Sequence, residues 1–195
     1  AELWFIRHFR TPWNLERRLQ GRRDIAIDDP LGAADRAALE RNRATLADVR
    51  FARVLCSPLL RARATAALHG FPDAAPRDEL AELDFGPWEG RLWSELEAEH
   101  PDVWHSAPQR LPLGETIDAF AARVRAIHDE IRAAPGDPVL LFGHGAWHGC
   151  LHCIVAGRPV TEFSRHHGIA NGGLVRIGVA GPAAGSGGVE LSSIR

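Results

Sequence analysis

The strongest constraint on the fold comes from three short apolar runs, Leu3–Ile6, Arg53–Cys56 and Val139–Phe142. Their apolar residues are nearly continuous rather than alternating, which is typical of parallel strands that are covered on both faces. A fourth segment, Leu174–Val179, predicts a later strand nearer an edge of the sheet. The stretch Ala180–Gly188 is rich in Gly, Ala and Ser and predicts a flexible turn before the final residues.

Segments with helical periodicity lie between these strands. The clearest has Ile or other apolar residues at steps of three and four, with Thr116 as a plausible N-cap and Pro135-Gly136 as a stop. The alternation of strands and helices predicts a single-domain, three-layer α/β/α sandwich with a mainly parallel central sheet. The helical segments are Ala33–Val49, Leu59–His69, Trp147–Val155 and the one containing Ile117, Phe120, Val124, Ile127 and Ile131.

Composition narrows the class of protein. A chain of 195 residues has enough interior for one core, so we expect a single domain over 1–195, with an excursion over the active site at about 72–112. The formal charge of −2 argues against nucleic acid or an anionic membrane as a partner. No apolar run is long enough to cross a bilayer. The three cysteines form an odd set, and we therefore expect reduced thiols and a cytoplasmic protein.

Basic side chains follow the strands. His8 comes after Leu3–Ile6 and Arg7, Arg61 follows Arg53–Cys56 in a Ser-Pro-Leu-Leu-Arg turn, and His144 follows Val139–Phe142. Ligands of open α/β sheets bind beyond the carboxyl ends of the strands, where these residues would meet. Imidazole and guanidinium groups gathered there predict a local site for phosphate.

The motifs at these positions resemble those of the histidine phosphatase superfamily, also called phosphoglycerate mutase-like. They occur in the order that the family shows and cover most of the chain. Each is weak alone, but together they are highly specific. They are Arg7-His8-x-x-Thr11, Trp13-Asn14, Leu19-Gln20-Gly21, Ser57-Pro58-Leu59-x-Arg61-Ala62 with Thr65-Ala66, Glu82-x-x-Phe85-Gly86-x-Trp88-Glu89-Gly90, Gly114-Glu115-Thr116 and Gly143-His144-Gly145.

This resemblance implies a phosphomonoesterase that acts through a phosphohistidine on a small phosphorylated metabolite, with no metal and no cofactor. His8 would be the nucleophile, Glu82 would protonate the leaving oxygen, and Arg7, Arg61 and His144 would hold the phosphate. The chemistry agrees, because a phosphomonoester carries roughly −1.5 to −2 charges and positive neighbours keep an imidazole neutral. Further substrate-binding candidates are Asn14, Thr11, Gln20, Gly21, Gly145 and Trp147.

Three other functions stay open. The first is a bisphosphoglycerate-dependent phosphoglycerate mutase, although mutases that resemble this chain carry a longer excursion with paired arginines, and here only Arg91 and Arg110 stand apart. The second is a catalytically silent phospho-ligand-binding domain, suggested by Phe9 and Arg10 where the family usually has Gly and then Glu or Gln. The third is a zinc site near His144, but its histidines and cysteines lack the usual ligand spacing.

The sequence also leaves the substrate and the oligomeric state open. Sugar phosphates, phosphoglycerates and nucleotide fragments all fit the phosphate-handling residues, because substrate choice depends on the excursion. A homodimer is the expected assembly only because it is common among soluble enzymes.

Overall fold

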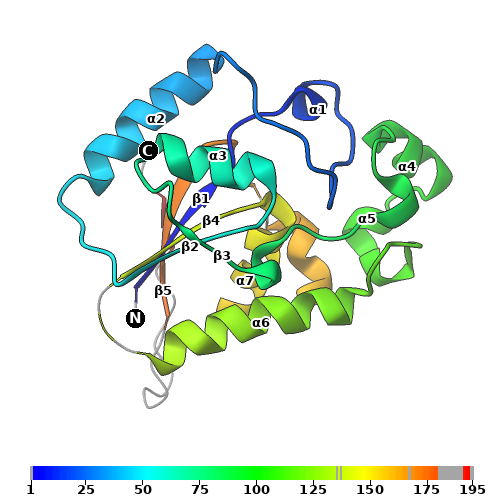
Figure 1. Ribbon diagram of the computed structural model, residues 1–195. Helices are drawn as coiled ribbons and strands as arrows, with labels where there is room; N and C mark the ends of the chain where they lie inside the picture. The colour runs from blue at the N-terminus through cyan, green and yellow to red at the C-terminus, as the bar shows by residue number, and fades with distance from the viewer. Residues whose placement is uncertain (1, 135, 137, 167, 180–190, 194–195) are drawn as a thin grey trace.

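A computed structural model of the chain describes residues 2–134, 136, 138–166, 168–179 and 191–193, and it is built on a six-stranded sheet (Figure 1). The strand order is β3-β2-β4-β1-β5-β6. The strands are β1 (Glu2–Arg7), β2 (Arg53–Cys56), β3 (Ala75–Pro76), β4 (Val139–Gly143), β5 (Leu174–Gly178) and β6 (Leu191–Ser193).

The sheet is mainly parallel, as the sequence predicted. β1 pairs in parallel with β4, β4 with β2, and β2 with β3, whereas β5 runs antiparallel to both β1 and β6. β5 is thus one strand inside the edge that β6 forms. The expected turn over Ala180–Gly188 lies outside the described residues.

Helices cover both faces of the sheet, which confirms the three-layer sandwich. α2 (Ala33–Leu46) and α3 (Leu60–Leu68) pack on one face, where Trp4, Ile6 and Phe142 are buried. α6 (Ile117–Ala133), α7 (Gly145–Val155) and the 3-10 helix η4 (Val160–Arg165) pack on the other. Figure 1 shows α2 and α3 above the strands and α6 below them.

The long helix α6 follows the predicted pattern. Thr116 caps it, and its hydroxyl accepts a hydrogen bond from the amide of Ala119 at 3.1 Å. The five apolar residues that repeat along the segment are all buried. α7 begins at Gly145, two residues before its predicted start, so His144 is its N-cap residue.

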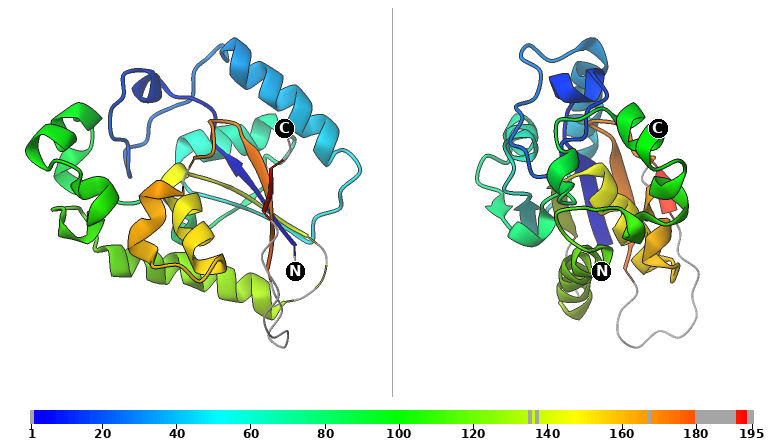
Figure 2. Two further views of the ribbon diagram at one scale, coloured as in Figure 1. Left: turned by 180° about the vertical axis from the view of Figure 1, so that it is seen from behind. Right: turned by 90° about the vertical axis from the view of Figure 1, so that its right-hand side faces the viewer.

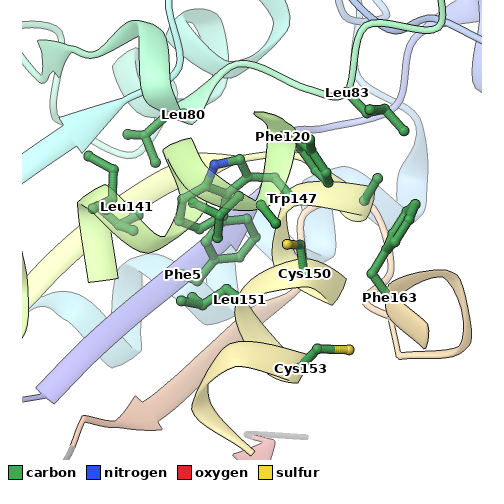
Figure 3. Close-up of a cluster of buried hydrophobic side chains, with 14 of the residues drawn as sticks. Phe5, Leu80, Leu83, Phe120, Leu141, Trp147, Cys150, Leu151, Cys153 and Phe163 are labelled. Atoms are coloured by element: carbon green, nitrogen blue, oxygen red, sulfur yellow. The ribbon is translucent and has the colours of Figure 1, made fainter. Parts of the chain in front are cut away.

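The largest core lies between α6, α7 and the sheet (Figure 3). Phe5 of β1 stacks on Trp147 of α7 with ring centroids 5.8 Å apart and planes 2° from parallel. Cys150 and Cys153 point into the same core from α7. This packing fixes the N-terminus of α7, and therefore His144, against the end of β1.

The excursion expected at about 72–112 is built from short elements around the carboxyl ends of the strands. Figures 1 and 2 show its two α-helices beside α1 (Pro12–Leu15), and an isolated bridge joins Arg18 to Leu92. The excursion comprises β3, η1 (Asp78–Leu80), η2 (Gly86–Trp88), α4 (Trp93–Glu99), α5 (Val103–Ser106) and η3 (Pro108–Arg110). Within the described ranges, no helix has the length and apolarity needed to cross a membrane.

The buried stripe of α6 gives a test of the core. We expect Ile127→Ala to lower the free energy of unfolding by roughly 2–5 kcal/mol, because Ile127 is fully buried and its truncation leaves a cavity. The control is Arg125, an exposed residue of the same helix. Arg125→Ala should change the free energy of unfolding by less than about 0.5 kcal/mol. Urea unfolding measures both. Equal effects would show that α6 does not bury this stripe.

Candidate active site

Two histidines meet where the central strands end. His8 follows β1, Ser57 follows β2 and His144 follows β4, and these three strands are parallel neighbours. The amide of His8 donates to the carbonyl of Gly143 at 3.0 Å, which ties the two strand ends together. The imidazole rings of His8 and His144 consequently lie with their centroids 5.3 Å apart.

The ring of His8 is held in one tautomer. Its Nδ1 lies 2.6 Å from the carbonyl oxygen of Phe9, so Nδ1 carries the hydrogen and donates it. Burial lowers the pKa of His8 well below its ordinary value, and the charges of Arg61 and Arg7 lower it further. His8 is therefore neutral near pH 7, with an unprotonated Nε2 available for attack.

His144 is fully buried behind this first ring. Its Nε2 lies 2.7 Å from the hydroxyl of Ser57, whereas its Nδ1 has no hydrogen-bond partner among the described residues. Burial, then the charge of Arg61, lowers its pKa well below the ordinary value. His144 is therefore neutral near pH 7.

Two guanidinium groups flank His8. Arg61, in the first turn of α3, donates to the carbonyls of Arg23 and Gly21, both at 2.7 Å. Arg7, at the end of β1, donates to the carbonyl of Ile169 at 2.7 Å. The Nε atoms of Arg7 and Arg61 are buried and have no partner within the described part of the chain. Burial lowers the pKa of Arg61 to about 10, so it stays charged at neutral pH.

Glu82 places its carboxylate on the N-terminus of α7. The carboxylate oxygens accept the amides of Ala146 at 3.1 Å, Trp147 at 3.0 Å and Leu83 at 3.0 Å. The side chain is 8% exposed and lines a cavity of about 170 Å³, which His8 and Arg61 also line. Its charge raises the pKa of Arg7 and Arg61 and offsets part of the cost of burying them.

The amide side chains of Asn14 and Gln20 complete the floor of the cavity. The Oδ1 of Asn14 accepts the amide of Thr11 at 3.0 Å, and the Oε1 of Gln20 accepts the Thr11 hydroxyl at 2.8 Å. With both oxygens occupied, each amide keeps its NH2 group for another acceptor. Thr11 itself is fully buried and orients these two residues without lining the cavity.

Two glycines allow the close approach of charged groups. Gly21 has φ +53°, and a Cβ there would lie 2.2 Å from the Oε1 of Glu89. A Cβ on Gly145 would lie 3.3 Å from the Cζ of Arg7. Both glycines line the same cavity of about 170 Å³ as His8 and Arg61. The cavity therefore brings together most of the side chains that the sequence singled out.

Thr11, His144 and Trp147 do not line this cavity, and the expected contact of Trp147 with substrate is wrong. Its side chain is fully buried against Phe5, and its indole Nε1 donates to the carbonyl of Glu79 at 2.8 Å. The sequence placed it close to His144, but the helical rotation of α7 turns the indole into the core. Its backbone amide supports Glu82 instead.

Phe9 and Arg10 leave the cavity unobstructed. The ring of Phe9 is buried on the α2 and α3 side, where it stacks on His69 at 5.3 Å. Gly172, with φ +70°, makes room for it, because a Cβ there would lie 2.6 Å from the Phe9 ring. Arg10 pairs with Asp28 at 3.5 Å and does not line the cavity. The two departures from the family pattern thus lie outside the site.

Several lining residues were missed from the sequence. Phe85, Trp93, Trp104 and Arg18 form the outer wall. These residues do not directly follow a strand, so the sequence gives no positional signal for them. Ser57 could have been found, because it is the first residue after β2 and belongs to the Ser-Pro-Leu-x-Arg motif.

The cysteines of α7 are packed as core residues. Cys150 and Cys153 are both fully buried, and burial raises the pKa of their thiols to about 12 and about 11. Across the described ranges, no three His, Cys, Asp or Glu side chains converge as metal ligands would.

Comparisons with known proteins agree with this geometry. The family model described as histidine phosphatase superfamily (branch 1) matches residues 3–184. "Putative phosphoserine phosphatase 2" of Hydrogenobacter thermophilus is 28% identical and covers 92% of this chain and 90% of its own. "Probable phosphoglycerate mutase GpmB" of an Enterobacter species is 31% identical and covers 84% and 79%.

Solved structures show the same fold. The mycobacterial glucosyl-3-phosphoglycerate phosphatase Rv2419c, in complex with VO3, superposes with a TM-score of 0.79 at 23% identity and covers 98% of this chain and 97% of its own. TTHB049 of Thermus thermophilus has a TM-score of 0.69 at 29% identity and covers 91% and 93%.

His69, beneath Phe9, gives a pH test. Burial lowers its pKa from 6.5 to about 4 in the folded protein. As the pH falls from 6.5 to 4, the unfolded chain takes up this proton first, so His69 lowers the free energy of unfolding by up to about 3 kcal/mol. We expect the free energy of unfolding of His69→Gln to depend less on pH over this range than that of the native protein. Identical profiles for native protein and His69→Gln would contradict the assignment.

Proposed function

Because the chain belongs to the histidine phosphatase superfamily, we propose that it hydrolyses phosphomonoesters through a phosphohistidine on His8. One observation supports this above the others. The Nδ1 of His8 donates to a backbone carbonyl, which leaves Nε2 unprotonated between two buried guanidinium groups. That arrangement supplies a nucleophile and the charge that a phosphate requires.

In the first step, Nε2 of His8 attacks the phosphorus and the ester oxygen leaves on the opposite side. Arg7 and Arg61 stabilise the phosphoryl oxygens through Nε and any N–H groups not taken by carbonyls, and the NH2 groups of Asn14 and Gln20 add donors. Glu82 gives its proton to the leaving alcohol.

In the second step, water attacks the phosphorus of the phosphohistidine. Glu82, now ionised, accepts a proton from that water, and Nε2 of His8 leaves as a neutral imidazole. The products are inorganic phosphate and an alcohol, and both residues return to their starting state. No step of this scheme calls on a metal ion.

Hydrolysis is preferred to phosphoglycerate mutase activity. Arg91 pairs with Glu95 and lies over the ring of Trp88, and Arg110 is an exposed residue of η3. Neither arginine lines the cavity, so neither is placed to hold a substrate carboxylate. Mutase activity remains the second candidate, because several relatives carry that name and Arg18 does line the cavity.

The nucleophile is tested by His8→Ala. We expect this variant to lose turnover of p-nitrophenyl phosphate by at least about 1,000-fold, because no other described side chain near the phosphate is placed to form the covalent intermediate. The control is His128→Ala. His128 lies outside the cavity, so this variant should keep native turnover. Rapid quench of the native enzyme should trap acid-labile, base-stable phosphate on His8. A native rate in His8→Ala would exclude this mechanism.

The two candidate reactions are separated by their products. We expect 3-phosphoglycerate, supplied with a catalytic amount of bisphosphoglycerate, to release inorganic phosphate or to remain unchanged. Phosphate release and 2-phosphoglycerate are measured in the same reaction. Accumulation of 2-phosphoglycerate without phosphate release would favour the mutase.

A further inference from the structure

The cavity around His8 adjoins a larger one. A second cavity of about 690 Å³ shares part of its wall with the cavity of about 170 Å³ around His8. The larger volume falls within the range of roughly 300–1,000 Å³ that small-molecule sites occupy. The shared wall is made of Asn14, Arg18, Trp93 and Trp104. The organic part of an ester whose phosphate lies at His8 would therefore contact this wall, on the side of the second cavity.

The shared wall presents aromatic rings held by their neighbours. The ring centroids of Trp93 and Trp104 are 5.1 Å apart, and Phe85 lies 5.6 Å from Trp93 and 5.4 Å from Trp104. Phe163 packs behind Trp104 at 5.1 Å. These contacts hold Trp93 in place before a ligand arrives, so little side-chain freedom is lost on binding.

Trp93 is the more accessible of the two indoles. Trp104 is only 5% exposed, whereas Trp93 is half-buried at the first position of α4. The amide of Trp93 donates to the carbonyl of Arg17 at 3.0 Å, which joins α4 to the loop after α1. Trp93 thus offers part of its surface to both cavities from a fixed backbone.

The charges of the second cavity balance. Glu16 and Glu97 line it together with Arg17 and Arg18, two charges of each sign. Arg18 is already engaged, because its Nε donates to Glu16 at 2.6 Å and its Nη1 donates to the carbonyl of Gly90 at 2.8 Å. The second cavity therefore has no excess positive charge to attract a second phosphate or a carboxylate.

From these observations we propose that Trp93 and Trp104 form a subsite for a ring with an apolar face, and that the substrate is a phosphomonoester of a ring-bearing alcohol. The ring can be aromatic or that of a sugar, since both present a face that packs on an indole. This inference rests on the proposed function for the position of the phosphate. A short open-chain phospho-acid would leave the aromatic wall without a contact.

The test compares esters of primary alcohols, so that the leaving groups match. One pair is 2-naphthylmethyl phosphate and ethyl phosphate, and the other is glucose 6-phosphate and glycerol 1-phosphate. KM is measured for native enzyme, Trp93→Leu, Trp93→Phe and the control Phe71→Leu. Phe71 is a partly buried aromatic residue on the opposite face of the sheet, outside both cavities.

We expect the native enzyme to have a lower KM for the ring ester in at least one pair, and the pair identifies the kind of ring. Trp93→Leu should reduce that preference by about 2- to 10-fold, as loss of one aromatic contact implies. Trp93→Phe, which keeps a smaller ring, should reduce it less, and Phe71→Leu should not change it.

Equal KM values within both pairs, or a preference that survives in Trp93→Leu, would overturn the subsite. Failure of the proposed function looks different, because the native enzyme would then release phosphate from none of the four esters. In that case calorimetry of the same esters against native protein and Trp93→Leu still measures the ring preference. Tighter binding of the ring esters that is lost in Trp93→Leu would support the subsite, and no difference would overturn it.

Discussion

The site depends on holding two guanidinium groups in the interior beside two neutral imidazoles. Burying Arg7 and Arg61 is costly, and their pKa values fall because burial disfavours the charged form. Backbone carbonyls accept hydrogen bonds from each guanidinium group, and the carboxylate of Glu82 offsets part of their positive charge. Burial and, after it, the same positive charges lower the pKa of His8 and keep the ring neutral, so the charges that would bind phosphate also prepare His8 for the proposed attack. Removing either cation would weaken both functions together.

That arrangement makes the loops as important as the sheet. The carbonyls that hold Arg61 come from residues 21 and 23, and the carbonyl that holds Arg7 comes from residue 169. The strands place Cα atoms, but these segments orient the charged ends of the side chains. The glycine at 172 shows the same dependence, because its missing Cβ makes room for Phe9. Phe9 therefore replaces the usual glycine beside the nucleophile without entering the cavity.

The inner half of the site, which is the part around His8 and His144, was predictable because it follows from the topology of the sheet. Parallel neighbouring strands end at one edge, so residues directly after them converge whatever the intervening chain does. His8 and His144 were identified on this ground, and Ser57 could have been. Trp147 was misplaced because nearness in sequence to His144 does not fix the face of a helix on which a side chain lies. The outer wall was not predictable, since Trp93 and Trp104 reach the cavity through the path of the excursion.

The inner residues and the outer wall of the site belong to different kinds of element, and this difference matters for substrate specificity. The inner residues lie at strand ends within the hydrogen-bonded sheet, and most of them are almost fully buried. The two tryptophans of the outer wall come from α4 and α5, and the amide of Trp93 donates to the carbonyl of Arg17 in the loop after α1. Under the proposed function, changes in that wall would alter what contacts the organic part of an ester. The proposed phosphate chemistry and the proposed choice of substrate thus depend on different elements of this chain.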